Sequence, residues 1–210
     1  PLQMMCNLHL ELLKASGGER TTIAKTPKLY RLWCRTRKNV INASEKQLHK
    51  PYDSCCKGGS ALEAAADRSL HAEIAHRNGM KVVATLYDMA KFFDTVEPVP
   101  LADSFQQTSF PPIDAVLAYQ IHLAPRVLQV STVASQMIRV DLTILPGCIY
   151  AVPFVKSLMH DGSSIVHGLH KHCKTYVDDV ANISVGDGPD VLDQIVRAAL
   201  HFNDKLVIKR

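Results

Sequence analysis

The segment HCKTYVDDVANISV, residues 172–185, carries the strongest structural signal in the chain. Two short apolar and β-branched runs, His172–Tyr176 and Val180–Val185, lie on either side of the turn-forming residues Val177-Asp178-Asp179. Runs of this kind separated by a short polar turn are typical of two antiparallel strands joined by a tight hairpin. The pattern therefore predicts a β-hairpin with two adjacent carboxylates at its tip.

A third carboxylate follows another predicted strand, 90 residues earlier in the chain. Lys81–Tyr87 is short, apolar and partly β-branched, and Asp88 comes directly after it. A charge there is costly unless it is paired or binds a metal. Three carboxylates brought together repel one another, and Mg²⁺ relieves this by binding carboxylate oxygens together with substrate phosphates. Asp88, Asp178 and Asp179 are therefore candidate metal ligands, with a helix cap and ordinary turn residues as the alternative interpretation.

Helices and strands alternate along the rest of the chain without a strict repeat. Ser60-Ala61-Leu62-Glu63 forms a capping box, which predicts the start of a helix. The apolar residues of this helix recur every four positions, which predicts an apolar stripe along it: Leu62, Ala66, Leu70 and Ile74. Further helices are expected over residues 113–123, up to 159, and over 191–202, and strands within 126–145 and at 206–208. The expected fold class is α+β, a mixed or antiparallel sheet with helices packed on one face.

The composition is that of an ordinary globular protein. Of the 210 residues, 47% are hydrophobic and 21% are charged, which argues against wholesale disorder and fibrous repeats. No apolar run is long enough to span a membrane and no signal peptide is visible, so we expect no membrane partner and an intracellular location, nuclear or cytoplasmic. Six cysteines without C-x-x-C spacing fit a reducing compartment. A first residue other than Met indicates a piece of a longer protein.

The charge is distributed unevenly along the chain. The net charge is +4, and residues 1–50 hold ten Lys and Arg against three Glu, so that this part carries +7 and the remainder −3. A basic N-terminal part followed by a mildly acidic remainder favours a polyanionic partner in one region and a cation site in another. A solvated basic face is the alternative interpretation.

Two of these segments resemble the catalytic motifs of reverse transcriptases. The stretch LYDMAKFFDTV, residues 86–96, resembles their first catalytic motif, especially that of non-LTR retroelements, and Tyr176-Val177-Asp178-Asp179 resembles their Y-x-D-D hairpin. The order of the motifs agrees with the family. Upstream, residues 18–24 and 29–33 resemble the fingers segment that precedes the palm. The resemblance covers the chain from about residue 13 to its end.

The resemblance implies a right-hand polymerase fold, with fingers over residues 1–80, a palm over 81–210 and no thumb within the 210 residues. The implied activity is that of an RNA-directed DNA polymerase, which transfers a nucleotidyl group from a dNTP to a primer 3′-hydroxyl on an RNA or DNA template by a two-metal mechanism. The implied catalytic and metal-binding residues are Asp88, Asp178 and Asp179, with Mg²⁺ as the cofactor and Mn²⁺ as an alternative. The implied nucleotide-binding residues are Arg20, Lys91, Phe92, Phe93 and Gly147, of which Phe93 is the steric gate against a 2′-hydroxyl.

The second family motif matches less well. The family has Gln-Gly followed by Ser-Pro, whereas this chain has Pro146-Gly147 followed by Ala151, and its proline is displaced to Pro153. Three alternatives therefore stay open: a catalytically impaired retroelement remnant that folds and binds nucleic acid, another palm polymerase that makes RNA, for which a gate at Phe93 would be pointless, and an unrelated domain with coincidental motifs. Template preference, the parent element and the oligomeric state are not decided by the sequence.

Overall fold

The computed structural model describes residues 6–12, 21–89, 91–141, 144–169 and 172–206, which contain seven strands and seven helices. The chain forms two compact units. Unit 1 comprises residues 1–47 and 91–157, and unit 2 comprises residues 48–90 and 158–210. Both units are therefore built from discontinuous segments. The expected division into fingers over 1–80 and palm over 81–210 stays a prediction.

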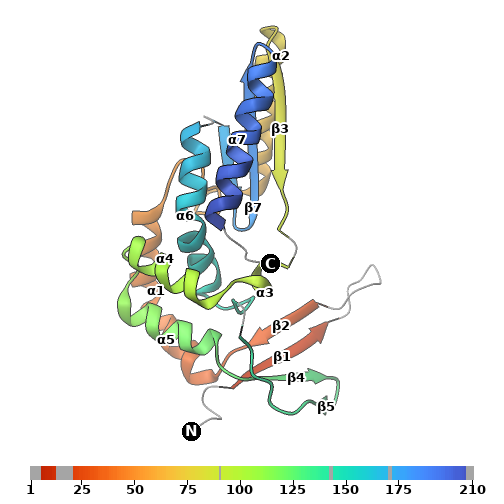
Figure 1. Ribbon diagram of the computed structural model, residues 1–210. Coiled ribbons are helices and arrows are strands. Elements are labelled where there is room, and N and C mark those ends of the chain that lie inside the picture. The colour runs from red at the N-terminus through yellow and green to blue at the C-terminus, as the bar shows by residue number, and fades with distance from the viewer. Residues whose placement is uncertain (1–5, 13–20, 90, 142–143, 170–171, 207–210) are drawn as a thin grey trace. The chain divides into compact units, whose positions relative to one another are not determined.

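Unit 1 contains a four-stranded sheet with the strand order β2-β1-β4-β5. The strands are β1 (Asn7–Leu12), β2 (Thr21–Lys25), β4 (Arg126–Val130) and β5 (Val133–Ala134). β1 pairs antiparallel with β2 and parallel with β4, so the sheet is mixed (Figure 1). The β-rich sequence over residues 126–145 thus yields two short strands.

The helices of unit 1 pack around an aromatic core. They are α1 (Lys28–Leu48), α3 (Phe92–Thr95), α4 (Pro98–Gln107), α5 (Pro112–His122) and the first turns of α6 (Ala151–Leu169). Phe154 is completely buried, and its ring centroid lies 4.6 Å from that of Phe105 and 5.6 Å from that of Phe110. These three rings supply a large part of the apolar area that holds α4 and α6 together. The helix expected over residues 113–123 is confirmed as α5.

A buried, fully hydrogen-bonded carboxylate joins α1, α5 and the residue before α6. Asp114 has no exposed surface and accepts hydrogen bonds from Arg37, with Nε–Oδ1 and Nη2–Oδ2 distances of 3.0 and 2.5 Å. The hydroxyl of Tyr150 donates to Oδ1 at 2.6 Å. Burial alone would raise the pKa of Asp114, but the hydrogen bonds from Arg37 and Tyr150 outweigh it and hold that pKa below its usual range. The ionised carboxylate is thus a structural group of unit 1.

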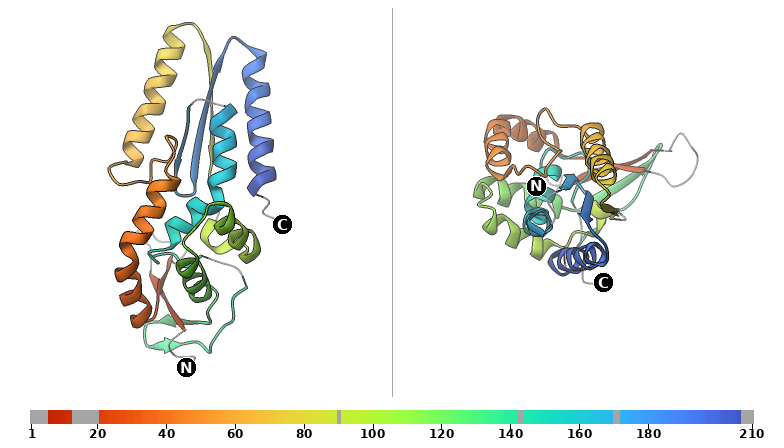
Figure 2. Two further views of the ribbon diagram at one scale, coloured as in Figure 1. Left: turned by 90° about the vertical axis from the view of Figure 1, so that its left-hand side faces the viewer. Right: turned by 90° about the horizontal axis from the view of Figure 1, so that it is seen from above.

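Unit 2 contains a three-stranded antiparallel sheet with the order β3-β7-β6. The strands are β3 (Lys81–Tyr87), β6 (His172–Tyr176) and β7 (Asp179–Gly186), and the helices are α2 (Ala61–Arg77) and α7 (Pro189–Leu206). On one face of the sheet, the ring of Tyr87 lies 4.9 Å from that of Phe202 on α7. On the other face, Lys174 pairs with Asp67 on α2 at 3.3 Å. Figure 2 shows the strands of this sheet between α2 and α7.

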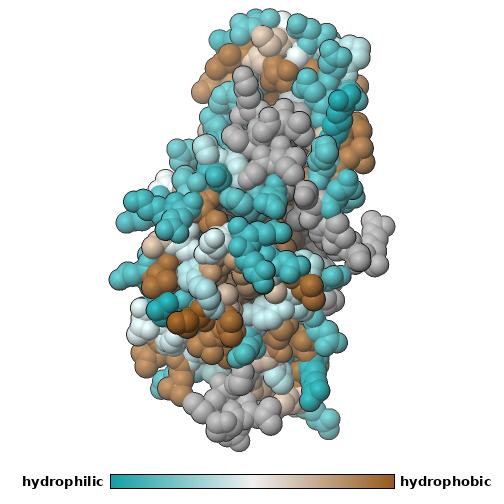
Figure 3. Space-filling model, turned by 60° about the vertical axis from the view of Figure 1, so that its left-hand side comes forward, coloured by the Kyte–Doolittle hydropathy of each residue, from teal (hydrophilic) through white to brown (hydrophobic). Residues whose placement is uncertain are grey.

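The capping-box prediction is confirmed, and the apolar stripe of the same helix lies on its exposed side. The side chain of Ser60 caps α2 by accepting a hydrogen bond from the backbone N–H of Glu63 at 3.0 Å. Three residues of this stripe are largely exposed: Leu62 at 80%, Leu70 at 56% and Ile74 at 50%. The buried positions of α2 are Ala64 and Ala75, small residues that let a helix approach its neighbours closely. Hydrophobic and hydrophilic side chains are interspersed over the face drawn in Figure 3.

The α+β class predicted from the sequence is confirmed. The strand expected over residues 81–87 and the two strands of the hairpin are present. The helix expected over 191–202 is α7, which extends to Leu206, so that this residue is helical rather than the start of a strand, and residues 207 and 208 lie outside the described part. Within the described residues, no helix has the length and apolar character needed to cross a bilayer.

Candidate active site

The tip of the β6–β7 hairpin is a two-residue turn. Tyr176 pairs with Asp179, so Val177 and Asp178 form the turn between the strands. Val177 has a φ of 58°, in the left-handed region that a β-branched residue rarely adopts. A positive φ at the first of two turn residues is the pattern of a type II′ turn, and strain of this kind costs about 1–3 kcal/mol. Asp178 is thus presented by a strained turn, directly before Asp179.

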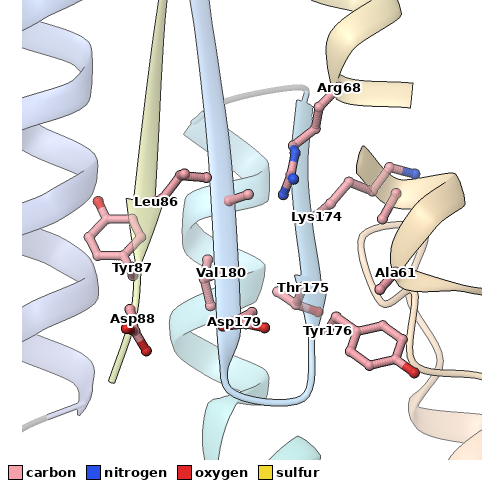
Figure 4. A pocket seen from close by; sticks show the side chains of 12 residues that line it. Ala61, Arg68, Leu86, Tyr87, Asp88, Lys174, Thr175, Tyr176, Asp179 and Val180 are labelled. Atoms are coloured by element: carbon pink, nitrogen blue, oxygen red, sulfur yellow. The ribbon is translucent and has the colours of Figure 1, made fainter. Parts of the chain in front are cut away.

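Strand β3 brings a third aspartate to the same end of the sheet. In the antiparallel pairing of β3 with β7, Tyr87 lies opposite Val180. Continuing this register by one residue places Asp88 beside Asp179, and opposite residues of antiparallel strands have Cα atoms about 4.5–5.5 Å apart. Figure 4 shows Asp88 at the end of β3 and Asp179 at the beginning of β7. The structure therefore gathers the three predicted aspartates at one edge of the unit 2 sheet.

These carboxylates have no cationic partner in the described part of the chain. Asp88 and Asp179 are exposed and Asp178 is half-buried. Partial burial raises the pKa of Asp178, and the negative charges of Asp179 and Asp88 raise it further. The effect of Asp88 and Asp179 on Asp178 is that of like charges nearby, which disfavour the ionised form of Asp178. A bound cation would relieve this repulsion.

The donor atoms fit a hard divalent cation. Mg²⁺ binds through one or two protein carboxylates and completes its coordination with water and substrate phosphates. Within residues 6–12, 21–89, 91–141, 144–169 and 172–206, no group of three His, Cys, Asp or Glu side chains is arranged to hold a metal by itself. The metal-binding roles of Asp88, Asp178 and Asp179 stay predictions.

The residues expected to bind the nucleotide belong to unit 1, whereas the aspartates belong to unit 2. Lys91 is exposed and has a φ of 52°, Phe92 is 3% exposed, and Phe93 is half-buried. Gly147 has a φ of 86°, a conformation that glycine adopts at no steric cost. Arg20 lies outside the described residues. The nucleotide-binding roles of these five residues stay predictions.

A pocket beside the hairpin contains two cationic residues that the sequence analysis missed. It has a volume of about 350 Å³ and lies between α2 and the face of the sheet that carries Leu86 and Ala181. Arg68 on α2 and Lys174 on β6 line it, together with Asp88 and Asp179. No motif marks Arg68, because only the folding of α2 onto the sheet brings it into one pocket with residues of the hairpin, and Lys174 is a single lysine of β6.

Comparisons with known proteins give matches among solved structures. No family model matches the chain, and no curated protein matches it. A Candida tropicalis telomerase truncated from the C-terminal domain is 15% identical with a TM-score of 0.64, covering 93% of this chain and 46% of the telomerase chain. The C. tropicalis telomerase in complex with a fragment of telomeric RNA is 13% identical with a TM-score of 0.68, covering 96% and 39%. The corresponding Candida albicans complex is 12% identical with a TM-score of 0.56, covering 94% and 40%.

At this identity the likeness shows the fold alone. The chain spans less than half the length of these telomerases, which are polymerases related to reverse transcriptases. The coarse part of the expected resemblance is thereby confirmed, and the narrower resemblance to non-LTR retroelements stays a prediction. The chain has the α+β fold of a reverse transcriptase-like right-hand polymerase.

Proposed function

We propose that this chain is the fingers and palm part of an RNA-directed DNA polymerase. Its reaction is the template-directed transfer of a nucleotidyl group from a dNTP to the 3′-hydroxyl of a primer on an RNA or DNA template. The observation that carries the proposal is the gathering of Asp88, Asp178 and Asp179 at one edge of a sheet in a polymerase-like fold. Two of the telomerases with this fold were solved with RNA, which supports a nucleic-acid partner.

The aspartates act by position and charge. Asp88 and Asp178 would hold Mg²⁺, or Mn²⁺ in its place, and Asp179 would add negative charge next to them. When bound, the metal favours ionisation of the attacking hydroxyl and stabilises charge on the transferring phosphoryl group. The strained turn at Val177 fixes Asp178 before substrate arrives, so that the chain contributes preorganisation rather than covalent chemistry.

The remaining predicted residues serve the incoming nucleotide. Arg20 pairs with its phosphates, the backbone N–H groups of Lys91 and Phe92 donate to the triphosphate, and Phe93 excludes a 2′-hydroxyl. Gly147 allows the backbone to approach the nucleotide closely. We extend the proposal to an intracellular protein of non-LTR retroelement origin, on the strength of the motif around Asp88.

A second candidate function is nucleic-acid binding without turnover. Pro146 stands where the family has glutamine, and Ala151 stands where it has serine. Glutamine can donate and accept hydrogen bonds, whereas proline offers no side-chain polar group and no backbone N–H. Loss of these contacts would impair the positioning of the nucleotide and leave the fold intact.

Primer extension with Mg²⁺ on RNA and DNA templates tests the proposal. We expect Asp178→Ala to reduce extension by at least about 100-fold, a loss typical of removing one group that stabilises transition-state charge. Asp193→Ala is the matched control, because Asp193 is an exposed aspartate of α7 that pairs with Arg197. Extension that does not depend on Asp178, with retained binding to the primer–template, would replace the proposal by the second candidate.

A further inference from the structure

The pocket beside the hairpin has a polar end, an apolar middle and an acidic end. Arg68 and Lys174 supply the cations, Leu86 and Ala181 are apolar residues of its wall, and the aspartate edge of the sheet closes it. Its volume of about 350 Å³ is in the range of small-ligand pockets, about 300–1,000 Å³. Leu86 is 71% exposed, which leaves its side chain free to contact a bound group.

The guanidinium of Arg68 has no partner in the described part of the chain. Figure 4 shows it extending from α2 toward the sheet. The neighbouring carboxylate Asp67 is already engaged, since it lies 3.3 Å from Nζ of Lys174 and 3.4 Å from Nδ1 of His71. Arg68 is half-buried, so solvent satisfies its five donors only in part. An unpaired guanidinium in a pocket is a binding group for an anion.

The rest of the pocket limits which anion fits. Asp88 and Asp179 repel a ligand that is negatively charged along its whole length. A ligand that carries its charge at one end and an uncharged body behind it avoids this repulsion, because its body lies along Leu86. One nucleotide of a nucleic-acid strand meets this requirement when its phosphate lies at Arg68 and its uncharged base enters the pocket, so that the other phosphates of the strand stay outside. The planar fork of arginine matches phosphate oxygens in two parallel hydrogen bonds.

We infer that this pocket holds one phosphate-bearing residue of the nucleic-acid strand, with Arg68 bound to the phosphate. The inference rests on the proposed function for the identity of the ligand. It adds a strand-positioning contact on α2, separate from the carboxylates and from the nucleotide-binding residues of unit 1. Lys174 adds a second cationic group from the sheet side of the pocket, where its Nζ lies 3.3 Å from Asp67.

Fluorescence anisotropy with an end-labelled 12-nucleotide single-stranded DNA tests the inference across a salt titration. We expect Arg68→Gln to weaken binding about 5- to 10-fold, and to reduce the slope of log K against log salt by about 0.7, the value for one phosphate contact on a single strand. Arg77→Gln is the matched control. Arg77 lies on the same helix, is 77% exposed and pairs with Glu73. We expect this variant to bind like the wild type.

Three results would overturn the inference. The first is that Arg68→Gln and Arg77→Gln have equal affinities and equal salt slopes. The second is that the wild-type chain does not bind the oligonucleotide. The third is that inorganic phosphate at matched ionic strength displaces the oligonucleotide, which would indicate a site for free phosphate. Equal thermal unfolding midpoints of the two variants exclude a structural cause. Failure of the proposed function would be a different result: primer extension would not change in Asp178→Ala, while Arg68→Gln would still weaken binding of the oligonucleotide.

Discussion

The two units of the molecule each contain an aspartate removed from full exposure, and the two respond to their surroundings in opposite ways. In unit 1, Asp114 is completely buried, yet its pKa lies below the usual range because Arg37 and Tyr150 bind the ionised form. In unit 2, Asp178 is only half-buried, yet its pKa is raised by partial burial and by the charges of Asp179 and Asp88. Partners, rather than depth of burial alone, decide the charge state that each site favours.

The difference separates a structural carboxylate from a functional one. Asp114 is saturated with donors and has nothing left to offer a ligand. Asp178 is surrounded by like charges, in a turn where Val177 is the only β-branched residue among the four non-glycine residues with positive φ in the described part of the chain. Uncompensated charge together with backbone strain is the pattern found where proteins bind substrates and metals.

Removal of the structural carboxylate has the largest expected effect on stability. Asp114→Ala leaves the buried hydroxyl of Tyr150 and the guanidinium of Arg37 without their acceptor, and we expect the free energy of unfolding to fall by about 3 kcal/mol. Urea unfolding at pH 7 measures the change. Asp103→Ala is the matched control, since Asp103 is exposed on α4, the neighbouring helix. A loss as small as that of the control would show that the network is not structural.

The pH dependence of the same variant provides a second readout. The pKa of Asp114 is lowered in the folded state, so its contribution to stability is present above the unfolded value of about 3.9 and is lost as the pH falls through the folded value. The difference in stability between wild type and Asp114→Ala should therefore be constant near neutral pH and shrink only in strong acid.

Relief of the strained turn should change the free energy of unfolding by less than Asp114→Ala does, and in the opposite direction. Val177→Gly removes the steric cost of a positive φ, about 1–3 kcal/mol, and adds the entropy cost of glycine, about 0.5–1 kcal/mol. We expect a net gain of about 1 kcal/mol in the free energy of unfolding. Val185→Gly is the matched control, because Val185 lies in the regular part of β7 and should lose stability. A loss in both variants would show that the turn at Val177 is unstrained.

The features that local sequence determines were predicted well. The strands of the hairpin and β3 follow from short β-branched runs bounded by turn residues, and the start of α2 follows from the capping box at Ser60. The side of α2 that meets the sheet does not follow from the sequence, because a four-residue repeat identifies an apolar stripe but does not show which side of the helix is buried. Small residues, Ala64 and Ala75, occupy that side.

The features that depend on long-range contacts were not predictable from the sequence. Asp114 and Arg37 are 77 positions apart, and no local pattern marks either of them as part of a buried ion pair. Arg68 lines the same pocket as Asp88 and Asp179 only because α2 packs on a sheet whose outer strand begins at His172. The three aspartates were recognisable because Asp88 directly follows a strand, Asp178 lies in a turn and Asp179 begins the next strand, where a carboxylate stands out among apolar neighbours.

Neutralisation of Asp178, the candidate catalytic carboxylate, has the smallest expected effect on stability. The effect should be a gain in stability, whereas removal of Asp114 should cause a loss. The pKa of Asp178 is higher in the folded state than in the unfolded state. The contribution of this side chain to folding stability is therefore fully present below the unfolded-state pKa of about 3.9, and it is lost as the pH rises through the folded-state pKa. At pH 7 the ionised side chain therefore destabilises the fold, and we expect Asp178→Asn to raise the free energy of unfolding by about 0.5 kcal/mol, a small figure because the group is half-exposed. Urea unfolding at pH 7 and pH 4 measures this gain, which should be smaller at the lower pH. Mg²⁺ should raise the unfolding midpoint of the wild type more than that of the variant, because only the wild type keeps all three carboxylates. Destabilisation by Asp178→Asn at pH 7 would mean that Asp178, like Asp114, is held by partners that stabilise its charge.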